Sequence, residues 1–220
     1  MMPEKGETMT ARAFERAAAT VSQPLQAAVT DVYISVDIET DGPIPGPFSM
    51  LSFALVEIGT VDGVKLARPS APRTFYREIR PISDRFETEA MAVNGLDREK
   101  LLRQGGDPAT VMNEARQFVA ELAVQGTPVL VAYPLSFDWS FLYWYFVNFG
   151  GHSPFNHSRC FDLKTAVAVK GHRTISRAGR DQLPEVLRSK LTHTHHALDD
   201  AREQADIFAR VFEWNGEDDQ

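Results

Sequence analysis

An apolar stretch that ends in acidic residues is the feature that most constrains the fold of this chain. Residues 31–39 read DVYISVDIE, with an apolar side chain at every second position. Because successive side chains of a β-strand point to opposite faces, this alternation predicts a buried strand with one fully apolar face. That face carries Val32, Ile34, Val36 and Ile38. The last residues of the strand then place Asp37 and Glu39 together on the other face.

The rest of the pattern predicts one α/β domain. Further strands are expected at 50–58, 74–79, 128–132 and 159–163, and helices at 97–104, 108–125, 138–149 and 196–214. Strands followed by alternating helices and strands favour a central mixed sheet of about five strands flanked by helices. We expect the domain to cover residues 29–214, after an N-terminal segment 1–28 that is either helical or loose and before an acidic tail, 215–220.

Net charge, cysteine content and the lengths of apolar runs indicate where the protein is located and which partners it can bind. The net charge of −7 argues against general affinity for long duplexes, because such binding needs basic side chains that neutralise phosphates. The single cysteine cannot form an intrachain disulfide, which favours a reducing, cytoplasmic location. The most apolar run, FLYWYFV at 141–147, is too short to span a membrane, and no apolar leader is visible. We therefore expect no membrane partner.

Asp37 and Glu39 form the first candidate site. Residues two apart in a strand lie on the same face, about 6.7 Å apart along the chain. Two carboxylates held there repel each other unless a positive charge lies between them, and Mg²⁺ and Mn²⁺ prefer such oxygen ligands. The alternative is a solvated strand end that runs into a turn.

Asp138 forms the second candidate site. It is the only acidic residue between Glu121 and Asp162. With Ser136 as the expected N-cap, Asp138 falls in the first helical turn, where the helix dipole favours negative charge. Its placement is explained either by that dipole alone or by delivery of a carboxylate to the end of the sheet.

The motif HTHHALDDAREQ, which begins at residue 193, forms the third candidate site. At 100° per residue, Asp199 points away from the apolar helix face, whereas Asp200 lies at its edge and can reach a site near the core. His195 converges with Asp200 only if it lies in the loop before the helix. An exposed polar loop is the alternative. The H-x-H-x-D-H zinc pattern does not fit, because residues 197 and 198 are Ala and Leu.

Together the three sites resemble the DEDDh 3′–5′ exonucleases, a family that includes polymerase proofreading subunits, ribonuclease T and oligoribonuclease. The resemblance rests on "DIETDG", "SFDW" and "HHALDDA" in this order and spacing, over about residues 31–214. It implies an RNase H-like fold in which two divalent ions, Mg²⁺ or Mn²⁺, are held by four acids. These ligands are Asp37, Glu39, Asp138 and Asp200, with His195 as the fifth catalytic residue.

The resemblance also implies an activity. It predicts two-metal hydrolysis of phosphodiester bonds at the 3′ end of single-stranded DNA or RNA, with release of nucleoside monophosphates and His195 as the general base. The alternative is a nucleic-acid-binding or adaptor module of a polymerase or RNA-processing complex with little activity of its own. A homodimer and a polymerase or RNA-processing partner both stay open, as does the choice between DNA and RNA.

Several positions outside these motifs also bear on function. The chain has Tyr133-Pro134 where the family usually has His-Asn, and Asn94 where it usually has His, so the family's contacts to base or sugar do not carry over. The segment 159–190 contains eight Lys or Arg against three acids, which makes it either a phosphate-binding strip or a solvated loop. Phe48 is either a stacking platform for a base or part of the core.

Overall fold

A sheet of six strands forms the middle layer of the computed structural model, which describes residues 30–217. The strand order is β3-β2-β1-β5-β6, and β4 also pairs with β2. The strands are β1 (Asp31–Thr40), β2 (Met50–Val61), β3 (Leu66–Ala67), β4 (Thr74–Glu78), β5 (Thr127–Ala132) and β6 (Cys160–Asp162). Since β1 is antiparallel to β2 and parallel to β5, the sheet is mixed, as the sequence predicts. The N-terminal segment 1–28 and residues 218–220 of the acidic tail lie outside the described residues.

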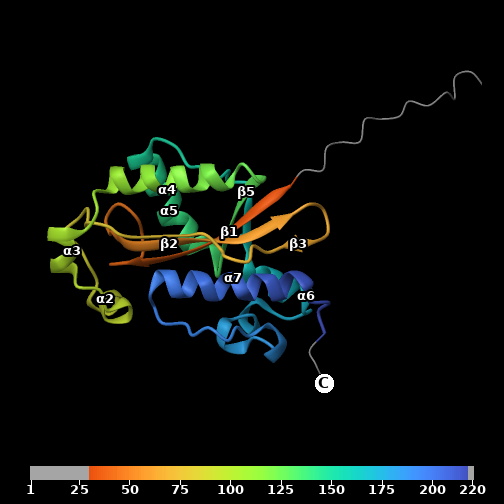
Figure 1. The fold of residues 1–220 in the computed structure, drawn as a ribbon. Coiled ribbons are helices and arrows are strands. Elements are labelled where there is room, and N and C mark those ends of the chain that lie inside the picture. Colours follow the sequence, from red (N-terminus) through yellow and green to blue (C-terminus); the bar gives the residue numbers. More distant parts are fainter. Residues whose placement is uncertain (1–29, 218–220) are drawn as a thin grey trace, which may run out of the picture.

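Helices cover both faces of this sheet (Figure 1). One face is covered by α4 (Pro108–Leu122) and α5 (Leu135–Gly150), and the other by α7 (Ala197–Glu213) with α6 (Leu163–Lys170) beside it. The short helices α2 (Thr88–Asn94) and α3 (Arg98–Gln104) lie at one end of the domain. Within residues 30–217, no helix has both the length and the apolar character that a membrane crossing requires.

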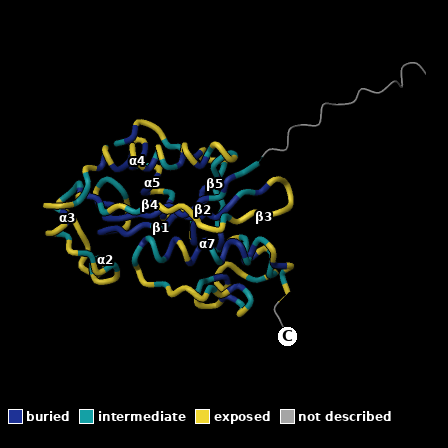
Figure 2. The backbone as a smooth tube through the Cα atoms, in the orientation of Figure 1, coloured by how far each residue is buried: buried dark blue, intermediate teal, exposed yellow. Residues whose placement is uncertain are grey.

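The central strand β1 divides the core into two. Its alternating apolar residues, Val32 to Ile38, pack in the cluster under α4 and α5, as the sequence predicts. Tyr33 points the other way and packs in the cluster under α7. Because side chains alternate along a strand, Asp37 and Glu39 belong to the α7 face. Figure 2 shows the strands and the inner sides of the helices as the buried parts of the chain.

The helix that carries Asp138 begins earlier than the sequence predicts. Helix α5 starts at Leu135, with Pro134 at the N-cap position, so the expected N-cap at Ser136 is wrong. The cap comes from a distant residue, because the Leu135 N–H donates to Oδ2 of Asp162 at 2.6 Å. Asp138 nevertheless lies in the first helical turn.

The other expected elements lie within a few residues of their predicted bounds. The sequence did not predict α2, β3, α6 or the three short 3₁₀ turns at Ile175–Arg177, Arg180–Gln182 and Glu185–Leu187. Helix α2 buries none of its residues, so it has no hydrophobic period to reveal it. Strand β3 has two residues and helix α6 has eight. These lengths are too short for a periodic signal to stand out.

Candidate active site

Four acidic side chains come together where β1 ends and where α5 and α7 begin. Asp37 and Glu39 are the last acids of β1 that face α7, Asp138 lies in the first turn of α5, and Asp200 lies in the first turn of α7. The exposed fractions of Asp200, Asp138 and Glu39 are 0%, 6% and 8%, and Asp37 is half-buried. The sites predicted separately from the sequence are thus brought together by three elements.

The distances and the pKa values show how close these acids are. Carboxylate oxygens of Asp37, Glu39 and Asp200 all lie within 4.8 Å of one another. Burial raises the pKa of Glu39 to about 8, with Asp200 and Asp138 adding to the shift, and burial raises that of Asp138 to about 7. The pKa of Asp37 is raised by burial and then by Asp138 and the other two acids.

This arrangement fits divalent cations. Buried carboxylates that repel one another are unfavourable when all are ionised, and a bound cation removes that repulsion. An all-oxygen donor set is the kind that Mg²⁺ and Mn²⁺ prefer. The residues present therefore fit the two ions that the sequence motifs imply.

The loop before α7 wraps around Asp200. The N–H of Thr194 donates to Oδ1 of Asp200 at 2.7 Å, and the N–H of His195 donates to Oδ2 at 3.0 Å. His195 has a φ of 57°, in the left-handed region, which turns the chain at this point. His195 thus lies in the loop before the helix, the placement that its convergence with Asp200 requires.

A second histidine lies closer to Asp200 than the sequence suggests. Nδ1 of His193 is 2.9 Å from Oδ2 of Asp200, and the rings of His193 and His195 are 4.5 Å apart between centroids. Ligand atoms of His193, His195 and Asp200 also lie within 4.8 Å of one another, a mixed nitrogen and oxygen group that suits zinc. Burial and then the charge of Arg180 lower the pKa of His193, which favours its neutral form.

The next turn of α7 adds two residues that the sequence reasoning missed. Nε2 of Gln204 donates to Oδ1 of Asp37 at 2.6 Å, and Gln204 is fully buried. Glu203 is buried beside it, and burial raises its pKa. Glu203 and Gln204 follow Asp200 by three and four residues, so the 3.6-residue helical period could have placed them on the same face as Asp200. Asp199, by contrast, is 49% exposed in its side chain.

Arg180 is the missed residue with the most contacts at the site. Its Nε lies 3.2 Å from Oε2 of Glu203, and its Nη1 lies 2.7 Å from Nδ1 of His193. Nη2 is buried and has no hydrogen-bond partner within residues 30–217. The charge of Arg180 lowers the pKa values of Asp37 and Asp138 against the larger effect of burial. Arg180 belongs to the basic segment 159–190, but its position in that segment gave no reason to select it.

The two departures from the family pattern have structural roles. The hydroxyl of Tyr133 donates to the backbone oxygen of Ala178 at 2.6 Å, and the Arg180 guanidinium lies 5.4 Å from the centroid of the Tyr133 ring. Tyr133 therefore holds the loop that carries Arg180. Asn94 donates from Nδ2 to the backbone oxygen of Thr40 at 3.0 Å, which ties α2 to the end of β1.

Phe48 and two residues of the basic segment, Lys170 and Arg159, have structural contacts. Phe48 is 7% exposed, and an added Cβ at Gly42 would lie 2.2 Å from its ring, so it packs in the core and does not offer a face to a base. Nζ of Lys170 donates to the backbone oxygen of Val211 at 2.6 Å, and Arg159 pairs with Asp31 at 3.0 Å.

Comparisons with known proteins agree with this geometry. Residues 32–212 match the family described as the 3′–5′ exoribonuclease Rv2179c-like domain. A relative from Escherichia coli, the 3′–5′ DNA exonuclease Cap18, is 34% identical over 182 residues, covering 82% of this chain and 91% of the relative.

Solved structures show the same fold. A 3′-exonuclease that recognises the 3′ end of a histone mRNA stem-loop has a TM-score of 0.63 at 13% identity, over 84% of this chain and 83% of that chain. The nuclease domain of 3′hExo, a DEDDh family member bound to rAMP, has a TM-score of 0.62 at 13% identity, over 86% of this chain and 94% of that chain. The expected RNase H-like fold is thus confirmed.

Proposed function

Since the chain belongs to the family of Rv2179c-like 3′–5′ exoribonuclease domains, we propose that it is a divalent-metal-dependent 3′–5′ exonuclease that acts on single-stranded nucleic acid and releases nucleoside monophosphates. The 3′–5′ exonuclease activity follows from the family and from the 34% identical relative. The metal dependence is supported by the site, and the single-stranded substrate is what the motif resemblance implies. The observation that carries the metal dependence is the convergence of three buried acids, Glu39, Asp138 and Asp200, with the half-buried Asp37.

The metal ligands in this proposal are Asp37, Glu39, Asp138 and Asp200. Bound there, Mg²⁺ or Mn²⁺ would supply the positive charge that stabilises the scissile phosphate and lowers the pKa of an attacking water. Gln204 orients Asp37 through its 2.6 Å hydrogen bond. The backbone N–H groups of Thr194 and His195 fix the Asp200 carboxylate.

His195 is the proposed general base. Its backbone is fixed at Asp200, and histidine is the side chain that most often accepts a proton in general base catalysis. His193 touches Asp200 directly through its ring and packs against the ring of His195. His193 therefore supports the position of His195 and is the alternative base if His195 fails its test.

Arg180 is proposed to contact the substrate phosphate. Its Nη2 lacks a hydrogen-bond partner among the described residues, and Glu203 holds the guanidinium beside the acids. A guanidinium offers paired donors that match phosphate oxygens. A strand end that enters the site would satisfy the unpaired Nη2 through one of these oxygens.

Both DNA and RNA remain substrates in this proposal. The matching family is described as an exoribonuclease, whereas the 34% identical relative is described as a DNA exonuclease. Discrimination between the two depends on contacts to the 2′-hydroxyl. The site contacts described above give no reason to prefer one of the two substrates.

Degradation of matched strands tests the proposal. We expect 5′-labelled single-stranded DNA or RNA to shorten stepwise from the 3′ end in Mg²⁺ or Mn²⁺, and excess chelator to stop the reaction. A 3′-phosphorothioate linkage should slow the first step, and Zn²⁺ alone provides a control for the histidine-containing group. Cleavage of circular single strands, or full activity in chelator, would overturn the proposal.

A further inference from the structure

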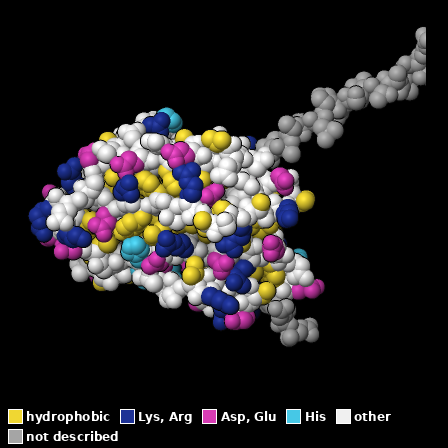
Figure 3. Space-filling view, viewed as in Figure 1, with side chains coloured by type: hydrophobic (Ala, Val, Ile, Leu, Met, Phe, Trp, Pro, Cys, Tyr) yellow, Lys and Arg dark blue, Asp and Glu magenta, His cyan; other side chains and the backbone are white. Residues whose placement is uncertain are grey.

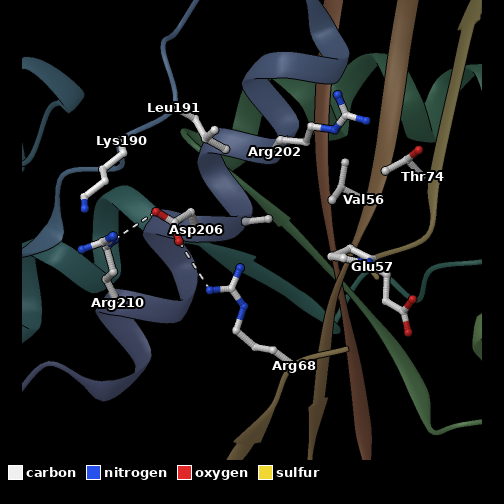
Figure 4. A pocket seen from close by; sticks show the side chains of 11 residues that line it. Val56, Glu57, Arg68, Thr74, Lys190, Leu191, Arg202, Asp206 and Arg210 are labelled. Carbon is white, nitrogen blue, oxygen red and sulfur yellow. Dashed lines mark hydrogen bonds and ion pairs between the residues drawn. The ribbon is translucent and has the colours of Figure 1, made fainter. Parts of the chain in front are cut away.

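A cavity with a cationic lining lies along α7, outside the cluster of acids. It has a volume of about 510 Å³ and is lined by residues from β2, from the segment between β3 and β4, from the loop before α7 and from α7 itself. Figure 4 shows Asp206 between Arg68 and Arg210, with Lys190 on the side of Arg210 and the guanidinium of Arg202 turned the other way, toward Val56 and Thr74. In Figure 3, Lys and Arg side chains gather, among a few acids, on the face where α7 lies.

The charges in this cavity are only partly compensated. Asp206 pairs with Arg210 at 3.0 Å and with Arg68 at 3.4 Å. Arg202 has one weak pair, 3.7 Å from Asp199, and Lys190 has no ion-pair partner within the described part of the chain. The lining thus has four cationic residues against two acidic ones in a chain whose net charge is −7. Such a local excess of positive charge attracts phosphate.

The floor of the cavity is apolar. Val56, Pro72, Leu191 and Ala205 line it between the charged groups. A volume of several hundred cubic ångströms exceeds what a lone phosphate needs and matches a group with a ring and a phosphate. The cavity therefore suits a nucleotide unit of a strand, with Lys190 and Arg202 on opposite sides for the phosphates that flank it and the apolar residues for its sugar or base.

A continuous series of contacts joins this cavity to the acids. The Tyr76 ring stacks on His196 with centroids 4.7 Å apart, and the pKa of Tyr76 is raised by burial, by Glu78 and in part by the charge of Glu39. His196 lies 3.8 Å from Asp199, which pairs with Arg202. From Asp200 to Asp206, α7 advances about 9 Å, or about three nucleotides of a stacked strand.

We propose that this cavity binds a nucleotide unit of the substrate strand, a few nucleotides upstream of the 3′ end. The inference rests on the proposed exonuclease function, because it places the 3′ end at the four acids. Lys190 and Arg202 each contact one phosphate of the strand, from opposite sides of the cavity, and the stacked pair of Tyr76 and His196 lies along the path between the two sites.

Strand binding as a function of length tests this subsite. Fluorescence anisotropy would follow 5′-labelled DNA and RNA of about two to about ten nucleotides, bound to the full chain in an Asp200→Asn background that does not consume them. The charge reversal K190E/R202E changes two exposed side chains without breaking the Asp206 pairs. The control K100E/R103E makes the same change in charge on α3, where both side chains have weak pairs of 3.9 Å and 3.8 Å.

We expect affinity to rise with length in the parent protein and in the control. In K190E/R202E the affinity for the longest strand should fall about tenfold, and the slope of log affinity against log salt should drop by about 1.4, the share of two phosphate contacts. Retention of the length-dependent gain in K190E/R202E, or an equal loss in the control, would overturn the proposal.

A free nucleotide is the competing occupant. Calorimetric titration with AMP separates a free nucleotide from a strand. If K190E/R202E lost AMP binding but its affinity still increased with strand length, the cavity would be a site for a free nucleotide and the strand subsite would be overturned. The binding measurements need no catalysis. If the unsubstituted protein showed no nuclease activity while binding still increased with strand length, the proposed function would be contradicted and the subsite would stay supported.

Discussion

The two faces of the sheet are built from different kinds of side chain. Under α4 and α5 the largest fully buried residues are aromatic, among them Tyr145, Phe141 and Phe146. Under the first turns of α7 the buried residues are the alanines at 197, 201 and 205, together with Asp200, Glu203 and Gln204. One face buries large aromatic side chains, and the other buries small side chains and charge under the first turns of α7, with large apolar residues such as Phe208 only farther along the helix.

This difference separates stability from function. Burial of aromatic side chains is a large favourable contribution to folding, whereas buried unpaired carboxylates are unfavourable. The alanines let α7 lie close to β1, so that Asp200 reaches Asp37 and Glu39. The α7 face thus holds a site at the expense of stability, and changes on the two faces should affect different quantities.

The largest expected effect comes from Asp200. Asp200→Asn should lower turnover by more than about 10³-fold, because it removes a carboxylate that interacts with Asp37 and Glu39 and weakens metal binding. Its matched control is Asp199→Asn, next in sequence but half-exposed, which should change turnover little. Steady-state turnover and calorimetric titration of Mn²⁺ measure both. Greater sensitivity at Asp199 would contradict the assignment of the helix face.

His195 gives the next largest effect. His195→Ala should lower turnover by about 10²–10⁴-fold with little change in metal or substrate binding, as expected for loss of a general base. The limb of the pH–rate profile that reports the general base should also disappear. His157→Ala, which changes an exposed histidine between α5 and β6, is the control. If His193→Ala lost turnover and His195→Ala kept it, the base would be His193.

Arg180 comes third. Arg180→Ala should lower kcat by about 10²-fold through the loss of a charged donor to the phosphate, and Arg180→Lys should recover only part of it, because Lys lacks the paired donors. Arg188, exposed and paired with Glu185, offers a control in the same segment. A change in thermal stability with unaltered kcat would show that Arg180 only braces Glu203 and His193.

The sequence revealed those parts of the site that local periodicity encodes. The alternation of β1 predicted where Asp37 and Glu39 lie, and the 3.6-residue period of α7 distinguished Asp200 from Asp199. Arg180 was not distinguished, because it arrives through short 3₁₀ turns whose position is set by the distant Tyr133 hydroxyl. The start of α5 was misplaced for the same reason, since its cap is the remote Asp162 and not the nearby Ser136.

The pH dependence of stability sharpens the comparison further. Glu39 and Asp138 have ordinary pKa values of 4.5 and 3.8 and raised values of about 8 and about 7 in the folded protein. The folded state therefore binds protons more tightly than the unfolded state, and this contribution to stability is lost as pH rises from about 4 to about 8. In chelator, the Tm should fall by several degrees over this range, and Asp138→Asn should flatten the decline.

Addition of Mg²⁺ or Mn²⁺ should reverse this trend. Because cations and protons compete for the same carboxylates, metal should raise the Tm most at the upper end of the pH range. Differential scanning fluorimetry across pH, with and without metal, measures both effects. A metal-free Tm that rises steadily with pH would show that these acids are not held close together in solution.

The smallest expected effect tests the other face. The backbone N–H of Met50 donates to the hydroxyl of Tyr145 at 2.8 Å, and both residues are fully buried. Tyr145→Phe leaves that donor without a partner, so we expect a loss of about 1–3 kcal/mol in the free energy of unfolding. Turnover and metal affinity should stay unchanged, because the change lies on the α4 and α5 side of the sheet. Tyr143→Phe, on the exposed side of the same helix, controls for the loss of a hydroxyl. Loss of turnover in Tyr145→Phe without loss of stability would show that the two faces are coupled through β2, and the division between them would fail.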